Sequence, residues 1–388
     1  MARRARPWYR ADRGVWCVTI DGKRHNLGPE KKAAFDAFHK LMLQPRRRQA
    51  VMDSVASVMD PFLDWVQRNR SAATYEWYRC RLQSFVDHYP ALTIAQLKPH
   101  HVERWAGDGK RSVTTRRNSM RSVKRCLKWA VSQGYLSESP IAHLEIPGGQ
   151  SREVYIPPAE FQQLLGFVTD PRFAELLSVT YECGCRPQES LRVESRHVDL
   201  ERRRWIFPAS ESKTKSMPRV VYLPESATEI TRRLVAEYPK GPLFRNAAGR
   251  AWTKDAIGCA FDRLQVRMGK AQMKAREVKV DEKDVAAFAK TLKKERFHGG
   301  QRVKKSQADL MCEARCKLTQ RMARDFAPRY SLYALRHSWA TNALKNGVDA
   351  LTVAILMGHR DPSTLARTYQ HLSHNPEHLL SQALRACV

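Results

Sequence analysis

The sequence predicts a mainly α-helical protein with small antiparallel β-sheets, an α+β protein of two or three domains. Three observations lead to this fold class. Apolar residues recur at helical spacing through most of the 388 residues. Alternation at period two, which is typical of strands, is confined to residues 8–28 and 197–224. A segment with one proline and two glycines, residues 145–154, is the best candidate for a domain boundary.

Residues 8–28 are predicted to form strands. Apolar and other residues alternate over Trp16–Ile20, and Asp21-Gly22 is a strong hairpin-turn signal. From Pro29 the apolar spacing becomes helical. We therefore expect a small module of two strands and a helix, followed by a basic linker at 44–50, so that this domain spans residues 1–50.

Residues 54–145 are predicted to be entirely helical. In the segment 112–136 an apolar stripe is formed by Met120, Val123, Leu127 and Val131. Basic residues occupy much of the remaining surface, namely Arg116, Arg117, Arg121, Lys124, Arg125 and Lys128. Such a face can simply be solvated. Because almost no acidic residue balances these charges, we favour a face that contacts phosphates.

Residues 153–388 are predicted to form a third, mostly helical domain with one β section. The stretches "HVDLERRRWIFP" (197–208) and "PRVVYLP" (218–224) are typical of strands, and they flank a basic turn at 210–217. Residues 266–325 are helix-prone, basic and only weakly periodic. They resemble an insertion, and no chemical role can be predicted for them.

The composition limits the function classes. There are 68 Lys and Arg against 39 Asp and Glu, a formal net charge of +29, which favours nucleic acid as the partner over an acidic membrane surface. No apolar run approaches the roughly 20 residues of a membrane span. The basic N-terminus lacks the apolar core of a signal peptide. These features predict a cytoplasmic, DNA-associated protein.

The nine cysteines are scattered and odd in number, which fits reduced thiols. Cys312 and Cys316, with His298, are a weak candidate for a zinc site because no second pair at ligand spacing follows. We therefore predict neither a metal nor an organic cofactor.

Several polar residues of the last domain occupy unexpected places. Arg186 follows the apolar helix predicted at 173–181, Glu189 is one helical turn further, and Arg336 lies in an apolar helix start. The other members are Lys213 in the basic turn, His359 after a glycine, and Tyr369 near the end of a helical segment. Each alone has an ordinary interpretation: structural ion pairs, a solvated turn, a helix cap, or a packed tyrosine.

Together these residues can perform phosphoryl transfer. Two guanidinium groups can hold a phosphodiester by bidentate hydrogen bonds and offset the charge of a pentavalent transition state. A lysine on a hairpin can protonate a leaving 5′ oxygen, and a tyrosine hydroxyl can attack phosphorus to form a covalent intermediate. This chemistry needs no metal.

Five motifs in order resemble the active site of the tyrosine recombinases, or phage-type integrases: "CGCRPQESLRV", "SKTK", "YALRHSWATNAL", "LMGH" and "ARTYQHL". The resemblance is strong over 153–388, which corresponds to the catalytic domain. Residues 54–145 are more loosely similar to the helical core-binding (SAM-like) domain, and residues 1–50 to the arm-type DNA-binding module. The resemblance implies that the two larger domains form a clamp on DNA.

The resemblance also implies the catalytic roles. Arg186 and Arg336 would be the paired arginines, Lys213 the general acid, His359 a support for the phosphate, and Tyr369 the nucleophile.

Two positions depart from the family pattern. The family usually has His three residues before its second arginine, where this sequence has Tyr333. A phenol can donate a hydrogen bond to phosphate but is a poor base at neutral pH. In addition, Tyr369 lies ten positions after His359 (369 − 359), one more than in many members.

The function implied is site-specific DNA recombination for a mobile genetic element. One strand would be cut through a 3′-phosphotyrosyl intermediate and rejoined without metal or ATP. The partners would be double-stranded DNA at a specific site, further protomers in a homo-tetramer on two sites, and an accessory DNA-bending or directionality protein. The alternatives are a type IB topoisomerase and a degenerate integrase that binds DNA without cutting. A terminal apolar stripe after Asn375-Pro376 would pack on its own domain or on a neighbouring protomer.

Overall fold

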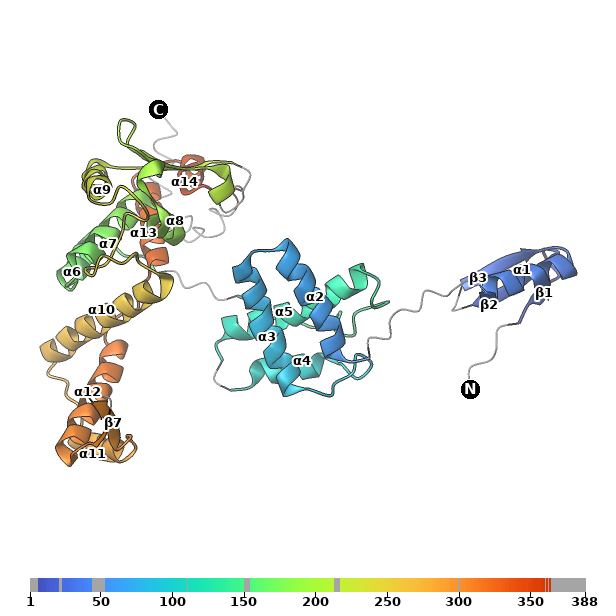
Figure 1. The fold of residues 1–388 in the computed structure, drawn as a ribbon, viewed down its shortest axis with the longest axis horizontal. Coiled ribbons are helices and arrows are strands. Elements are labelled where there is room, and N and C mark those ends of the chain that lie inside the picture. The colour runs from blue at the N-terminus through green and yellow to red at the C-terminus, as the bar shows by residue number, and fades with distance from the viewer. Residues whose placement is uncertain are drawn as a thin grey trace, which may run out of the picture. The chain divides into compact units, whose positions relative to one another are not determined.

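The computed structural model describes residues 6–20, 23–43, 53–109, 111–149, 154–212, 217–298, 301–359, 361 and 363 (Figure 1). The chain divides into two compact units, Met1–Ser151 and Arg152–Val388, and the division falls inside the segment 145–154. The predicted fold class is confirmed, since long helices dominate and each sheet is small and antiparallel. In the described part of the chain no helix is long and apolar enough to cross a membrane.

The first unit begins with a small sheet covered by one helix. The three strands pair in sequence order, and their core contains Val18, Leu27 and Ala34. Only two strands were expected here. The register shifts at Trp16/Cys17, so that Cys17 and Val18 are both buried despite the predicted alternation. The elements are β1 (Trp8–Arg10), β2 (Val15–Ile20), β3 (Lys23–Gly28) and α1 (Lys31–Leu43).

Among the described residues four helices form most of the rest of the first unit, which was predicted to be entirely helical; residues 89–98 and 133–149 are turns and loops instead. Three of them begin at serines, Ser54, Ser71 and Ser112, whose side chains accept hydrogen bonds from the backbone three residues on. On the last helix the predicted stripe is buried except at Val131, which is only partly buried. The helices are α2 (Val55–Asn69), α3 (Ala72–His88), α4 (Pro99–Gly107) and α5 (Val113–Ser132).

The second unit is built around one large apolar core to which helices and a three-stranded sheet contribute. The sheet confirms the predicted β section, with the strand order β4-β5-β6. The elements are α6 (Pro158–Gly166), α7 (Pro171–Cys183), α8 (Pro187–Arg192), β4 (Val198–Asp199), β5 (Arg204–Phe207), β6 (Arg219–Tyr222), α9 (Glu225–Glu237), α13 (Leu332–Lys345) and α14 (Ala350–Met357). Helix α13 packs against α7 and α14.

A glycine lets α7 and α13 approach each other closely. Gly184 ends α7 in the left-handed conformation at φ 58°. A Cβ atom there would lie 2.4 Å from the Trp339 ring of α13. Glycine is therefore required at this position, because of both the left-handed backbone and the close approach of the Trp339 ring. The turn at Gly184 leads the chain to Arg186.

The segment 266–325 forms a projecting helical arm (Figure 1). It leaves the core through α10 (Lys254–Ala275), whose first half packs in the main core at Ile257, Phe261 and Leu264. It returns through α12 (Gln307–Asp325), and a Cβ at Gly269 of α10 would lie 1.8 Å from the Ala323 oxygen of α12. Between them lie α11 (Glu282–Lys290), β7 (Glu295–His298) and β8 (Gln301–Lys304), beside a separate small core formed by Val285, Ala289, Leu310 and Ala314.

Candidate active site

Arg336 is buried in the middle of α13, with 2% of its surface exposed. Its Nη1 donates to the Gly184 oxygen at 2.6 Å, and its Nη2 donates to the Met357 oxygen at 2.7 Å. Burial, followed by the charge of Arg186, lowers the pKa of Arg336 to about 10. The guanidinium remains protonated at neutral pH. A buried cation held by neutral carbonyls is costly unless an anion joins it.

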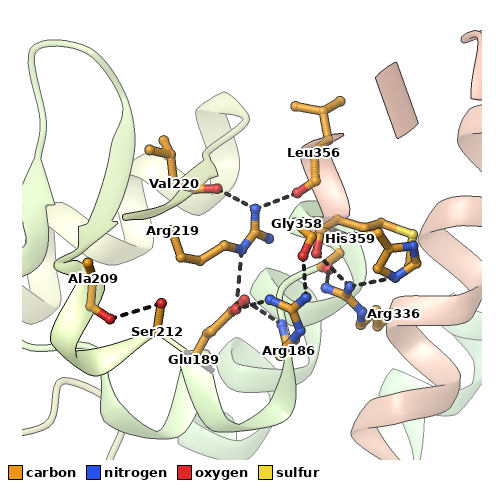
Figure 2. A network of polar contacts seen from close by, with 12 residues as sticks. Arg186, Glu189, Ala209, Ser212, Arg219, Val220, Arg336, Leu356, Gly358 and His359 are labelled. Atoms are coloured by element: carbon orange, nitrogen blue, oxygen red, sulfur yellow. Dashed lines mark hydrogen bonds and ion pairs between the residues drawn. The ribbon is translucent and has the colours of Figure 1, made fainter. Parts of the chain in front are cut away.

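Arg186 lies at the start of α8 and points toward the same place (Figure 2). Its Nη1 donates to Glu189 Oε1 at 2.8 Å, and its Nη2 donates to the Gly358 oxygen at 2.6 Å. Glu189 Oε2 also accepts from the Arg186 backbone amide at 2.7 Å. The carboxylate predicted to orient this arginine therefore fixes both its main chain and its side chain.

His359 follows α14 directly, after Gly358 ends that helix in the left-handed conformation. Its Nε2 lies 3.4 Å from Arg336 Nη2. Burial, then the charges of Arg336 and Arg186, lower the pKa of His359 to about 4. The imidazole is therefore neutral. If Nε2 accepts from Arg336, Nδ1 carries the proton, and this buried atom has no hydrogen-bond partner among the described residues.

A third arginine, Arg219 of β6, was not predicted. It is 7% exposed. Its Nε donates to Glu189 Oε1 at 3.2 Å and its Nη1 to the Leu356 oxygen at 2.7 Å, as Figure 2 shows. The signal was present in "PRVVYLP", because Arg219 has the same parity as the buried Val221 and therefore faces inward.

Glu189 lies between two of these cations. Burial alone would raise the pKa of its carboxyl group, but Arg219 and Arg186 outweigh that effect and hold the pKa below its usual value. Gly358 is also constrained by this cluster. A Cβ there would lie 2.9 Å from Arg219 Cδ and 3.2 Å from Arg186 Nη1. The glycine of "LMGH" thus leaves room for two guanidinium groups.

Tyr333 lies in the first turn of α13 and is 52% exposed. It lines a cavity of about 1050 Å³ together with Arg186, Arg219 and Ser212. His337, one turn further along the helix, lines the same cavity, and its ring centroid lies 5.4 Å from that of Tyr333. His337 was not among the predicted site residues, although its place directly after Arg336 could have indicated it.

Lys213 and Tyr369 lie outside the described residues, as do the linker 44–50 and the terminal segment 375–388. The ends of the turn that carries Lys213 are described. Glu211, two residues earlier, accepts from Arg196 at 2.7 Å and contacts His197 Nε2 at 3.0 Å. Arg219 begins the next strand. Both described ends of this segment are therefore held by bonded side chains, and Arg219 at its far end belongs to the arginine cluster.

The basic face of α5, in the first unit, is not uniformly free. Arg117 donates to the Pro147 oxygen, and Lys124 Nζ donates to the Leu144 oxygen at 2.7 Å. These two side chains hold the segment that follows the helical bundle. The exposed cations on this face are Arg116, Arg121, Arg125 and Lys128. Only they are available to an external partner without loss of an internal bond.

In the described part of the chain, no three His, Cys, Asp or Glu side chains are grouped so that they could hold a metal ion. The arrangement gathers cations instead. Three guanidinium groups and a neutral imidazole approach one point beside a cavity, which suits a singly charged phosphodiester.

Comparisons with known proteins agree with this geometry. Residues 252–375 match the sequence model of the phage integrase family. No curated protein matches the chain. Among solved structures, the Tn1549 transposon integrase in complex with transposon right-end DNA matches with a TM-score of 0.57 at 15% identity, covering 85% of this chain and 99% of that one.

Two structures of lambda integrase are also similar. The dimer bound to a COC′ core site has a TM-score of 0.52 at 11% identity and covers 93% of each chain. The tetramer bound to a Holliday junction has a TM-score of 0.53 at 11% identity, covering 92% of this chain and 96% of that one. At such low identity these likenesses establish the fold.

Proposed function

We propose that this chain is a tyrosine recombinase of the phage integrase family, whose sequence model matches residues 252–375, and that it is a site-specific recombinase that cuts and rejoins DNA. The observation that carries the proposal is the convergence of Arg186, Arg336 and His359 on one point. The buried charge of Arg336 has no bonded carboxylate among the described residues, and a scissile phosphate would supply the missing anion.

In the proposed first step, Tyr369 gives its phenol proton to solvent and its oxygen attacks phosphorus. The new bond joins the tyrosine to the 3′ phosphate, and the bond between phosphorus and the 5′ oxygen breaks. The leaving 5′ oxygen takes a proton from Lys213. In the second step the 5′ hydroxyl of a partner strand attacks the phosphotyrosine and gives its proton back to Lys213, while the released Tyr369 oxygen takes a proton from solvent. The number of phosphodiester bonds is conserved, so no ATP is needed.

The arginines stabilise charge in both steps. Arg336 and Arg186 would direct donors at the non-bridging oxygens as the phosphorane forms. Burial and the neighbouring cations keep the imidazole of His359 neutral, with a single N–H. That N–H would be on Nδ1 and would donate a hydrogen bond to the phosphate. Glu189 and Arg219 would act as positioning residues. Tyr333 would contact the phosphate by a hydrogen bond, since its phenol is a poor base at neutral pH.

The other parts of the chain would bind DNA. We propose that residues 54–145 form the core-binding domain and close on duplex DNA as a clamp with the catalytic domain. Residues 1–50 would form the arm-binding module. The lambda integrase neighbours are a dimer on a core site and a tetramer on a Holliday junction. By analogy four protomers would assemble on two sites here, with an accessory DNA-bending or directionality protein.

A suicide substrate tests the function. A duplex that carries the attachment site is nicked so that the fragment released by cleavage diffuses away, and the trapped protein–DNA adduct is measured in the presence of EDTA. An adduct confined to the specific site is expected. Relaxation of any supercoiled plasmid without site preference would indicate a type IB topoisomerase. Tight binding without an adduct would indicate a degenerate integrase.

A further inference from the structure

The end of the arm carries an exposed, strongly basic β-ribbon that the catalytic chemistry does not use. Strands β7 and β8 pair antiparallel, from Glu295↔Lys304 to His298↔Gln301. Residues 290–305 contain seven Lys and Arg against one Glu. All four residues of β8 are exposed. A two-stranded ribbon that buries neither face contributes little to a core, so its concentration of positive charge indicates a role in binding a partner.

Most of the ribbon's cations have no carboxylate partner among the described residues. Arg296 lies 3.6 Å from Asp309, and Lys305 lies 2.6 Å from Glu313. The cations without such a pair are Lys290, Lys293, Lys294, Arg302 and Lys304. Five solvated like charges so close together repel one another, and a polyanion relieves that repulsion.

The ribbon also exposes an aromatic side chain. Phe297 is 70% exposed and lies outside the small core of the arm. The Arg302 guanidinium lies 5.7 Å from its ring centroid. In register Phe297 is opposite Arg302, and Lys304 lies two residues further on the same face. One face of the ribbon therefore combines an apolar ring with two cations, as a surface that contacts sugars and phosphates requires.

The arm holds this ribbon at a defined distance from the active site. Helix α10 begins at Lys254, which lines the active-site cavity, and runs for 22 residues. At 1.5 Å per residue that is about 33 Å. With a rise of 3.4 Å per base pair, a duplex alongside the arm would present phosphates roughly ten base pairs away. Gln265 of α10 donates to the Arg324 oxygen in α12 and to the oxygen of Ala327, two residues after that helix, each at 2.9 Å.

We propose that the β7–β8 ribbon is a second DNA-contacting element, which binds phosphates of the duplex that flanks the cleavage site. Lys294, Arg302 and Lys304 bind the phosphates, and Phe297 packs against the sugar edge. This rests on the proposed function, because the flanking duplex is defined by a cleavage site. The ribbon has the dimensions that a DNA groove admits.

The test is the salt dependence of binding to random-sequence duplex DNA. A triple variant, Lys294→Gln, Arg302→Gln and Lys304→Gln, removes three phosphate contacts. The slope of log affinity against log salt concentration should become shallower by about 2.7, at about 0.9 per contact. Hydroxyl-radical footprinting on the attachment site should lose one protected stretch beside the cleavage site. Phe297→Ala should lower affinity and leave the slope unchanged.

The matched control neutralises three other exposed lysines of the arm, Lys270→Gln, Lys274→Gln and Lys279→Gln. It should retain the footprint. None of the substituted side chains belongs to the arm's small core, so thermal unfolding should be unchanged in both variants. An unaltered slope and footprint in the ribbon variant would overturn the proposal. So would a change only in the self-association of DNA-free protein, because the ribbon would then contact a second copy of this chain.

These outcomes are separate from the test of the proposed function, because binding does not require cleavage. If the wild type forms the adduct and the ribbon variant has an unaltered salt slope, only the proposal for the ribbon is refuted. A shallower slope without any adduct refutes the recombinase and leaves the ribbon as a DNA-binding element.

Discussion

At the residue scale, the central feature of the site is the positive charge of Arg336, which is buried where an unpaired charge is energetically costly. Arg336 is almost completely buried, and its two bonded partners are carbonyl oxygens. The sequence indicated this residue because a cation in an apolar helix start is unexpected. It could not show that Arg219 joins the cluster through Glu189, because that contact depends on how β6 packs beside α8.

Arg336→Lys should slow cleavage by roughly 10²–10³, the usual effect of losing one donor to a developing oxyanion. An ammonium keeps the charge but cannot reach both carbonyls and the phosphate. Single-turnover cleavage of the suicide substrate measures this. As a control, Arg233→Lys changes an exposed ion-pairing arginine and should leave the rate unaltered. If Arg336→Lys cleaves the substrate as fast as the wild type, Arg336 does not bind the phosphate.

The low pKa of His359 predicts how stability depends on pH. Its pKa falls from 6.5 to about 4 in the folded protein. Between these values the unfolded chain binds the additional proton. The contribution of His359 to stability is therefore complete above pH 6.5 and is lost as the pH falls toward 4. Chemical denaturation at several pH values should show a shallower acid loss for His359→Gln than for the wild type. Identical profiles would contradict the assigned environment.

At the element scale, periodicity predicted where helices and strands lie, but not which exposed cations are already engaged. On α5 six basic residues looked equivalent in sequence. In the structure Arg117 and Lys124 bind backbone oxygens 30 and 20 residues away. Such long-range contacts leave no trace in local spacing. They divide one predicted DNA-binding face into residues that are exposed and residues that bond the following segment.

This division gives a matched pair of variants on α5. Arg121→Gln should reduce the salt slope of DNA binding by about 0.9 and leave stability unchanged. Lys124→Gln should leave the slope nearly unchanged and lower the free energy of unfolding by roughly 1–3 kcal/mol, because it removes a charged hydrogen bond. Salt titrations and denaturation curves of both variants measure this. The opposite assignment of the two effects would show that Lys124 contacts DNA and that Arg121 stabilises the domain; an unaltered slope in both variants would show that neither residue contacts DNA.

The anchored turn between β5 and β6 supports a test of the general acid. Lys213→Ala should be rescued by a substrate with a 5′-bridging phosphorothiolate, because a thiolate leaves without protonation. Lys254 lines the active-site cavity and provides the control, since Lys254→Ala should show no selective rescue. If the sulfur substrate restores neither variant, or both alike, Lys213 is not the acid.

At the scale of the whole molecule, the order of short motifs indicated that Arg186, Arg336 and His359 belong to one site, and the structure brings these three together although Arg186 and Arg336 are 150 positions apart (336 − 186). The motifs could be found in the sequence because each has a local structural cause. One example is Gly358, which precedes His359 and adopts the left-handed conformation. The arm was recognised only as an unusual interval. Its weak periodicity follows from its architecture, because a thin pair of helices with a small separate core has few buried positions.

The proposed recombination requires a covalent bond between DNA and Tyr369. The most direct measurement is to trap the adduct on a suicide substrate, digest it with trypsin and nuclease, and identify by mass spectrometry the peptide that retains a nucleotide. Cleavage after Arg367 and Arg385 gives residues 368–385, whose single tyrosine is Tyr369. We predict that this peptide carries the phosphate and that Tyr369→Phe abolishes the adduct without weakening DNA binding. A nucleotide on residues 330–336, which contain Tyr333, or an adduct formed by the phenylalanine variant, would contradict the account.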